Sequence, residues 1–195
     1  MKVLITGAQG QVGKELTQIA NEKGFKVISA GRGDLDITQA INVESYITQC
    51  QPDIVINAAA FTAVDNAESE QDLAFAINRD GAKNIAGVCK KHNIPLLHIS
   101  TDYVFDGTKS KPYSENDSVS PLGVYGESKW QGEEAIRKNL SDYLILRVAW
   151  VFGAQGNNFV KTMLRLGEDS DELNVVADQF GGSSPAKDIA QTLII

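Results

Sequence analysis

Cysteine, histidine and long apolar segments are scarce in this chain of 195 residues. The two cysteines, Cys50 and Cys89, fall in segments of helical pattern without the spacing of metal ligands or of a disulfide framework, so we expect reduced packing residues and no metal site. No apolar run approaches the ~18 residues of a membrane span, and the opening MKVLITGAQG is not a charged leader followed by an apolar segment. We therefore expect a cytoplasmic protein with no membrane partner.

A surplus of positive charge is also absent. The net charge is −7, and no group of Lys and Arg residues is dense enough to neutralise a nucleic-acid backbone. Nucleic acid is therefore not an expected partner. With 43% apolar and 22% charged residues, the composition is that of a globular protein with one substantial core and part of a second lobe.

Three glycines follow the first predicted strand. The strand is KVLIT at 2–6, and Gly7, Gly10 and Gly13 come before a segment with apolar residues at helical spacing, 12–23. Glycines permit a tight turn and the close approach of a pyrophosphate to a helix N-terminus. The triplet alone also fits a plain strand-to-helix turn, but its place after the first strand favours dinucleotide binding.

The second predicted strand, 26–30, ends at Gly31-Arg32, where an NAD-binding unit usually carries an acid for the ribose 2′-hydroxyl. No carboxylate stands between this strand and Asp34. An arginine here can pair with a 2′-phosphate, which favours NADPH over NADH. The alternative is a solvated surface arginine.

Strands and helices alternate along the rest of the chain. Further strands are expected at 54–57, 95–100, 143–149 and 173–176, and helices at 39–49, 73–92, 125–138, 159–166 and from about 186. This alternation predicts an α/β fold with a doubly wound parallel sheet, an NAD(P)-binding Rossmann fold. We expect the strand order 3-2-1-4-5-6, with the first and fourth strands flanking the ligand crevice, and His98 as a core histidine.

Tyr125 and Lys129 stand four residues apart on a predicted helix. That spacing puts two side chains on one face, about 6 Å apart at Cβ. A nearby ammonium stabilises a phenolate, so we expect the pKa of Tyr125 to be lowered and the phenol to exchange protons with a carbonyl oxygen. The alternative is a chance pair on a solvated helix face.

Six segments in chain order resemble the extended short-chain dehydrogenase/reductase superfamily. They are GAQGQVG (7–13), NAAAFTAVDNAE (57–68), STDYVFDG (100–107), SPLGVYGESK (120–129), RVAWVFG (147–153) and DQFGG (178–182). The resemblance implies NADPH-dependent reduction of the C4 ketone of dTDP-4-dehydro-L-rhamnose, which gives dTDP-L-rhamnose for surface polysaccharide. A nucleotide sugar is then the expected partner, and a homodimer is left open.

The resemblance also assigns roles to residues. Tyr125 is the general acid, Lys129 holds the nicotinamide ribose, and Thr101 bonds to the substrate carbonyl. Predicted cofactor contacts, including those from the glycine and arginine arguments, are Gly7, Gly10, Gln11, Val12, Gly13, Arg32, Asp36, Ile37, Ala60, Phe61, Thr62, Tyr125 and Lys129. Predicted substrate contacts are Thr101, Asp102 and Trp150.

Relatives of this kind continue for roughly another domain's length. We therefore expect a Rossmann domain over 1–153 and the start of a truncated substrate lobe over 154–195, ending on exposed Leu193, Ile194 and Ile195. Two other functions are left open. One is a nucleotide-sugar epimerase or dehydratase, although Tyr103 stands where dehydratases carry a glutamate. The other is a non-catalytic NADP-binding regulator resembling the methionine adenosyltransferase β subunit.

Overall fold

Five strands of largely β-branched and apolar residues form a parallel sheet in the computed structural model, which describes residues 1–194. They are β1 (Lys2–Thr6), β2 (Lys26–Ala30), β3 (Ile54–Asn57), β4 (Leu96–Thr101) and β5 (Tyr143–Val148). A second, two-stranded sheet joins β6 (Val151–Phe152) to β7 (Ser184–Pro185). The predicted α/β class with a parallel central sheet is confirmed.

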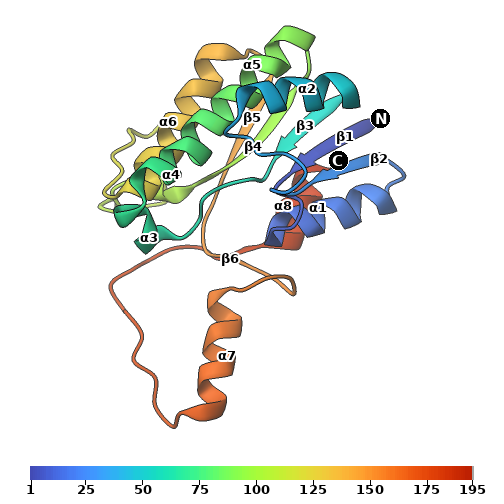
Figure 1. The fold of residues 1–195 in the computed structure, drawn as a ribbon. Coiled ribbons are helices and arrows are strands. Elements are labelled where there is room, and N and C mark those ends of the chain that lie inside the picture. The colour runs from blue at the N-terminus through green and yellow to red at the C-terminus, as the bar shows by residue number, and fades with distance from the viewer. Residues whose placement is uncertain (195) are drawn as a thin grey trace.

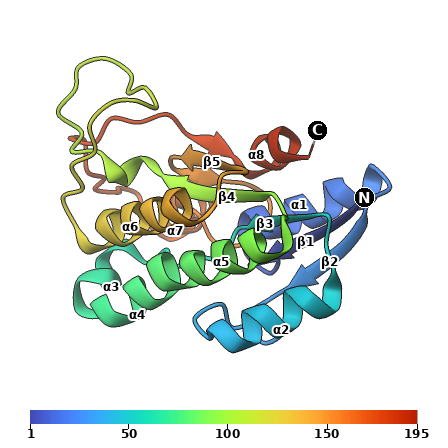
Figure 2. The same ribbon diagram turned by 90° about the horizontal axis from the view of Figure 1, so that it is seen from above.

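Helices cover both faces of the main sheet (Figures 1 and 2). On one face, α2 (Ala40–Cys50), α5 (Ala82–His92) and α6 (Val124–Asn139) enclose a core cluster that includes Leu4, Val55 and Leu96. On the other face, α1 (Gln11–Glu22) and α8 (Ala186–Leu193) pack together over Val3, Ile5 and Ile56. Between β3 and α5 lie α3 (Val64–Ser69), α4 (Gln71–Phe75) and the π-helical turn η1 (Ala76–Gly81), and a 3₁₀ turn, η2 (Asp102–Val104), follows β4.

The strand order is β2-β1-β3-β4-β5, so the expected order 3-2-1-4-5-6 is wrong. After β2 the chain adds no strand beyond it. Leu35 and Ile37 instead pack into the core, and the Asp36 carboxylate accepts hydrogen bonds from the backbone and hydroxyl of Thr38. Helix α2 then returns the chain across β1 to β3. The topological switch point therefore lies between β1 and β3, where ligands bind in open α/β sheets.

The end of the described chain is buried rather than exposed. Leu193 and Ile194 are 8% and 3% exposed, because α8 packs on α1 beside Leu16 and Ile19. The Ile194 carbonyl also accepts a hydrogen bond from the Lys23 ammonium. The expected exposure is thus wrong for Leu193 and Ile194, and Ile195 lies outside the described residues.

The single helix expected over 73–92 is interrupted. Here the chain forms α4, the π-turn η1 and α5, and the wider turn carries Asn78 into the interior. Asn78 bonds both backbone polar groups of Phe61 and the hydroxyl of Ser128. Single π-turns inside helices are frequent at functional sites.

Residues 170–183 hold no helix or strand, so the strand expected at 173–176 is wrong. Val175 and Val176 are exposed and pair with no described strand, and a β-branched run without a partner leaves its backbone groups unpaired. Before this segment, α7 (Phe159–Asp169) extends away from the layers and buries none of its residues (Figure 1). Within residues 1–194, no helix is long and apolar enough to cross a membrane.

Candidate active site

The glycine loop packs directly on the exit from β3. Gly7 has φ of +66°, and a Cβ there would lie 2.5 Å from the backbone nitrogen of Ala59. A Cβ on Gly13 would lie 2.2 Å from the Gly7 carbonyl oxygen. Only glycine fits these two positions. Helix α1 begins at this loop without a side-chain cap on its first amides, so its N-terminus is suited to a phosphate.

A cavity of about 300 Å³ opens beside the glycine loop, at the ends of β1 and β2. Its lining comprises Ala8, Gln9, Lys14, Thr17, Gln18, Ser29, Gly31 and Asp34. Arg32 is exposed on the adjoining turn, and the Asp34 carboxylate accepts a 2.9 Å hydrogen bond from the Gly31 amide. The sequence argument placed Arg32 correctly after β2. It overlooked Lys14 and gave no role to Asp34, since neither stands in the expected position of the motif.

The loop after β3 holds Ala60, Phe61 and Thr62. Ala60 and Phe61 are half-buried and Thr62 is exposed, and Asn78 anchors the backbone of Phe61 at 2.9 and 3.1 Å. Of the other predicted cofactor contacts, the Asp36 carboxylate accepts a hydrogen bond from Thr38 within its own turn, and Ile37 is buried in the core.

Thr101 and Asp102 follow the carboxyl end of β4. The Thr101 hydroxyl donates to the Asp102 carboxylate at 3.3 Å and accepts from the Tyr103 amide at 3.2 Å. Burial raises the pKa of Asp102 above its usual range. The rings of Tyr103 and Tyr125 meet edge to face at 5.6 Å, so this strand end and α6 form one wall.

Tyr125 and Lys129 both lie on α6, as predicted, but the predicted effect on the phenol is wrong. Burial raises the pKa of Tyr125 to about 12, partly offset by the neighbouring Thr101 hydroxyl. The Lys129 nitrogen instead donates to the Ile99 carbonyl at 2.6 Å and lies 3.4 Å from His98 Nε2. Because burial raises its pKa, the phenol is protonated at neutral pH, which is the form needed to donate a proton.

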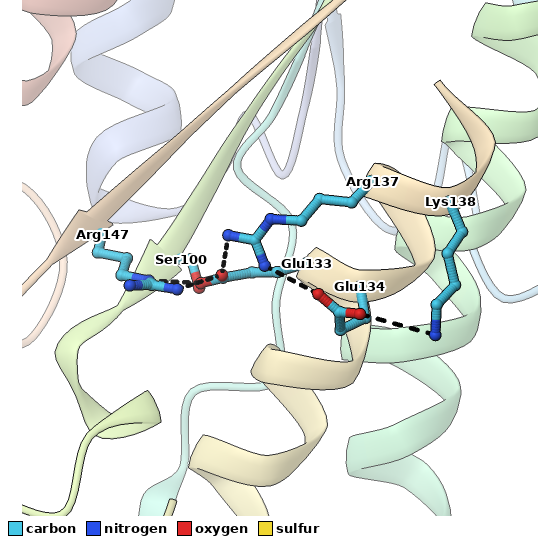
Figure 3. A network of polar contacts seen from close by, with 6 residues as sticks. All are labelled: Ser100, Glu133, Glu134, Arg137, Lys138 and Arg147. Carbon is cyan, nitrogen blue, oxygen red and sulfur yellow. Dashed lines mark hydrogen bonds and ion pairs between the residues drawn. The ribbon is translucent and has the colours of Figure 1, made fainter. Parts of the chain in front are cut away.

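A buried carboxylate lies one turn beyond Lys129 on α6. Glu133 is fully buried and accepts hydrogen bonds from Ser100, Arg137 and Arg147, as Figure 3 shows. Burial alone would raise its pKa, but these partners outweigh it and hold the pKa of Glu133 below its usual range. This network joins α6 to β4 and β5 directly behind Thr101.

The far side of the glycine loop contacts the chain beyond β5. Gln11 donates to the Val151 carbonyl at 3.3 Å and accepts a 2.8 Å hydrogen bond from Asn158. Trp150, at the end of β5, has φ of +44° and is 43% exposed, with its ring 6.4 Å from that of Phe159. A bulky residue with positive φ is a strained conformation that tends to occur at functional positions.

Sequence reasoning missed the buried polar residues behind the site. These are Asn57, Asn78 and Glu133, and the pattern that could have indicated them is a polar residue within an otherwise apolar strand or helix face.

A parallel sheet with this glycine loop at its switch point, with Thr101 at the end of β4 and Tyr125 beside it on α6, defines a Rossmann-fold domain of the reductase class. The family described as RmlD substrate binding domain matches residues 1–195. The chain belongs to this family.

Named relatives agree with this assignment. A dTDP-4-dehydrorhamnose reductase of Aggregatibacter actinomycetemcomitans is 47% identical over 99% of this chain and 66% of its own length. The crystal structure of a dTDP-4-dehydrorhamnose reductase from Clostridium acetobutylicum is 44% identical, with a TM-score of 0.97 over 100% of this chain and 69% of its own. The Bacillus anthracis reductase, solved in complex with NADP, is 41% identical, with a TM-score of 0.96 over 98% of this chain and 68% of its own. The chain thus spans about two thirds of the length of these relatives.

Proposed function

We propose that this protein reduces the C4 ketone of dTDP-4-dehydro-L-rhamnose with NADPH and so produces dTDP-L-rhamnose. The observation that carries the proposal is the position of the Tyr125 phenol, which α6 holds beside Thr101 at the carboxyl end of β4. Two hydroxyls at one strand end can bond a single carbonyl oxygen. The relatives from Aggregatibacter actinomycetemcomitans and Clostridium acetobutylicum, named for this activity, support the substrate class.

The residues around the glycine loop fit a dinucleotide. Gly7 and Gly13 let the loop pack tightly on the exit from β3, the uncapped start of α1 suits a pyrophosphate, and the cavity beyond it suits an adenosine end. NADPH supplies the hydride when bound. Arg32 and Lys14 provide positive charge for a 2′-phosphate, and the Bacillus anthracis complex with NADP supports this choice. NADH is the alternative, because the Asp34 carboxylate could accept a hydrogen bond from a 2′-hydroxyl.

The chemistry left to this chain is one proton transfer. Hydride addition to C4 converts the ketone to an alkoxide, and the O–H bond of Tyr125 breaks as its proton moves to that oxygen. The product is an alcohol and the phenol becomes a phenolate. Thr101 donates a hydrogen bond to the same oxygen as its charge develops.

Substrate contacts are proposed along the rim made by Asp102 and Trp150. Both follow the carboxyl ends of neighbouring strands, and Trp150 presents an exposed ring. The expected boundary at 153 is wrong for α8, which covers the same sheet as α1, so we assign residues 1–153 and α8 to the cofactor domain. The segment 154–183 is assigned to the beginning of a substrate lobe, which the exposed apolar side chains of Phe159 and Leu164 on α7 support. A cytoplasmic location and a nucleotide-sugar partner complete the proposal. A net charge of −7 argues against nucleic acid.

The test uses the complete protein that carries this sequence. Mixed with dTDP-4-dehydro-L-rhamnose and NADPH, it should consume NADPH in proportion to ketone lost, with dTDP-L-rhamnose as the product in a proton NMR spectrum. An epimerase or dehydratase would change the sugar without net NADPH loss, and a regulator would bind NADPH without turnover. Either result would replace the reductase assignment.

A further inference from the structure

A row of buried polar side chains crosses the sheet from β1 to α6. The Thr6 hydroxyl donates to Asn57 Oδ1 at 2.7 Å, Asn57 Nδ2 lies 3.0 Å from His98 Nδ1, and His98 Nε2 lies 3.4 Å from Lys129 Nζ. All four are at most 2% exposed. The strand register places Thr6 beside Asn57 and Asn57 beside His98, so three neighbouring strands contribute one residue each.

The orientation of the Asn57 amide is fixed by a backbone donor. The Ala59 amide donates to Asn57 Oδ1 at 3.1 Å, and a backbone N–H cannot act as an acceptor. The oxygen of Asn57 therefore faces Ala59 and Thr6, and its NH₂ group faces His98. Since that NH₂ is a donor, His98 Nδ1 must accept and must carry no proton. The ring proton of neutral His98 is consequently on Nε2.

The Nε2–H group of His98 points at the nitrogen of Lys129. An ammonium has three donors and no acceptor, so charged Lys129 would set two donors against each other at 3.4 Å. An uncharged amine has a lone pair that can accept a hydrogen bond from His98 Nε2–H. The amine still donates a hydrogen bond to the Ile99 carbonyl at 2.6 Å. The arrangement therefore suits the uncharged lysine better than the charged one.

We propose that His98 is a positioning residue for Lys129, fixed by Asn57 as its Nε2–H tautomer and favouring the uncharged, proton-accepting amine. The inference rests on the proposed function for its catalytic meaning, because Lys129 shares α6 with the proton donor Tyr125. A lysine that changes charge near neutral pH can exchange a proton during turnover, whereas a permanently charged lysine only supplies a field.

Burial and the charged groups around Lys129 shift its pKa and that of His98 in definite directions. Burial lowers the pKa of Lys129 to about 8, and the carboxylate of Glu133, on the same helix, opposes this. Burial and the neighbouring Lys129 hold the pKa of His98 well below its ordinary value, which agrees with a ring that stays neutral. From β5, Arg147 is paired with Glu133, and Tyr125 on α6 is protonated. His98 is thus the titratable group of β4 that contacts the lysine nitrogen.

The tautomer can be measured without any turnover. In protein labelled with ¹⁵N-histidine, two-bond proton–nitrogen correlations distinguish Nδ1–H from Nε2–H imidazole, and the exposed His92 serves as an internal reference. We expect His98 to remain the Nε2–H tautomer between about pH 6 and 9. Finding Nδ1–H, or an imidazolium in this range, would overturn the proposal.

The second measurement is the pKa of Lys129, followed through its ¹³Cε signal and identified by its loss in Lys129→Met. His98→Phe keeps the bulk but removes the donor, so the acid dissociation constant of Lys129 should fall about tenfold. His92→Phe is the matched control and should leave it unchanged. An unchanged or higher constant in His98→Phe would refute the proposed role.

Asn57→Asp provides a variant of the same shape should His98→Phe not fold. The carboxylate still accepts from Thr6 and Ala59 but would also accept from His98 Nδ1–H, so the spectrum should switch to the other tautomer. Persistence of Nε2–H in this variant would count against the inference. Because these readouts need no substrate, they distinguish failure of this inference from failure of the reductase assignment.

Discussion

Arg147 makes a two-point ion pair with the buried carboxylate of Glu133. Its Nε and Nη2 atoms donate to the two oxygens at 2.9 and 2.7 Å, and the guanidinium also lies 5.0 Å from the ring centre of Phe105. Ser100 adds a 2.6 Å hydrogen bond to the same carboxylate. The hydrogen bond from Ser100 fixes the end of β4, next to Thr101, to the middle of α6.

We predict that Glu133→Ala lowers the free energy of unfolding by about 3–5 kcal/mol, because it removes the buried carboxylate and leaves the largely buried guanidinium of Arg147 without its partner. Urea unfolding at pH 7 measures this. Glu134→Ala, which removes a more exposed carboxylate of the same helix, is the control and should cost about 1 kcal/mol or less. Equal losses in both variants would contradict the importance of the buried pair.

Glu133 should also make stability depend on pH. Its folded pKa lies below its unfolded value, so its contribution is present above the ordinary pKa and is lost as the pH falls through the folded pKa. Glu133→Gln should therefore flatten the acid limb of a plot of unfolding free energy against pH. An unchanged acid limb would show that Glu133 does not titrate on unfolding.

Tyr125→Phe should lower kcat by about 10²–10⁴-fold and leave the Kd for NADPH nearly unchanged, since the hydroxyl acts on the carbonyl and the ring still packs against Tyr103. Stopped-flow turnover and fluorescence titration separate the two effects. Tyr143→Phe, an exposed tyrosine on β5, is the control. A near-normal kcat for Tyr125→Phe would mean that another group donates the proton.

Arg32→Ala should weaken NADPH binding by about 1.5–3 kcal/mol, the value of one charge-assisted contact, and leave NADH binding little changed. Asp34→Ala should weaken NADH binding and leave NADPH binding little changed if the Asp34 carboxylate accepts a hydrogen bond from a ribose hydroxyl. Isothermal titration with both cofactors measures the four affinities. Equal losses for both cofactors in Arg32→Ala would make it an ordinary surface residue.

Trp150→Ala should raise KM for the nucleotide sugar more than it changes the Kd for NADPH, because the exposed ring lies at the proposed substrate rim. Steady-state kinetics with each ligand varied in turn measure the difference. Trp130→Ala is the comparison, since that ring stacks on Arg137 and Arg147 instead. A larger effect on NADPH than on the sugar would move Trp150 to the cofactor side.

The sequence predicted those parts of the fold that depend on local pattern. The glycine spacing after KVLIT and the helical spacing of Tyr125 and Lys129 were sufficient to locate the loop and α6. The strand order was not accessible, because it depends on whether the strand at 54–57 pairs with β1 or with β2, and both neighbours offer similar apolar strands. The direction of the Lys129 side chain likewise depends on the Ile99 carbonyl, which no residue type reveals.

The π-turn at Ala76–Gly81 makes this part of the chain sensitive to its length as well as to the identity of Asn78. Removing one residue would convert it to a regular α-helix, which is the better backbone conformation, but would rotate Asn78 by about 100° relative to the residues beyond the turn. The bridge from Phe61 to Ser128 would then be lost. A single-residue deletion here should consequently be harmful even at positions where a substitution is tolerated, and an alignment gap at this turn would mark relatives that hold the loop after β3 by other means.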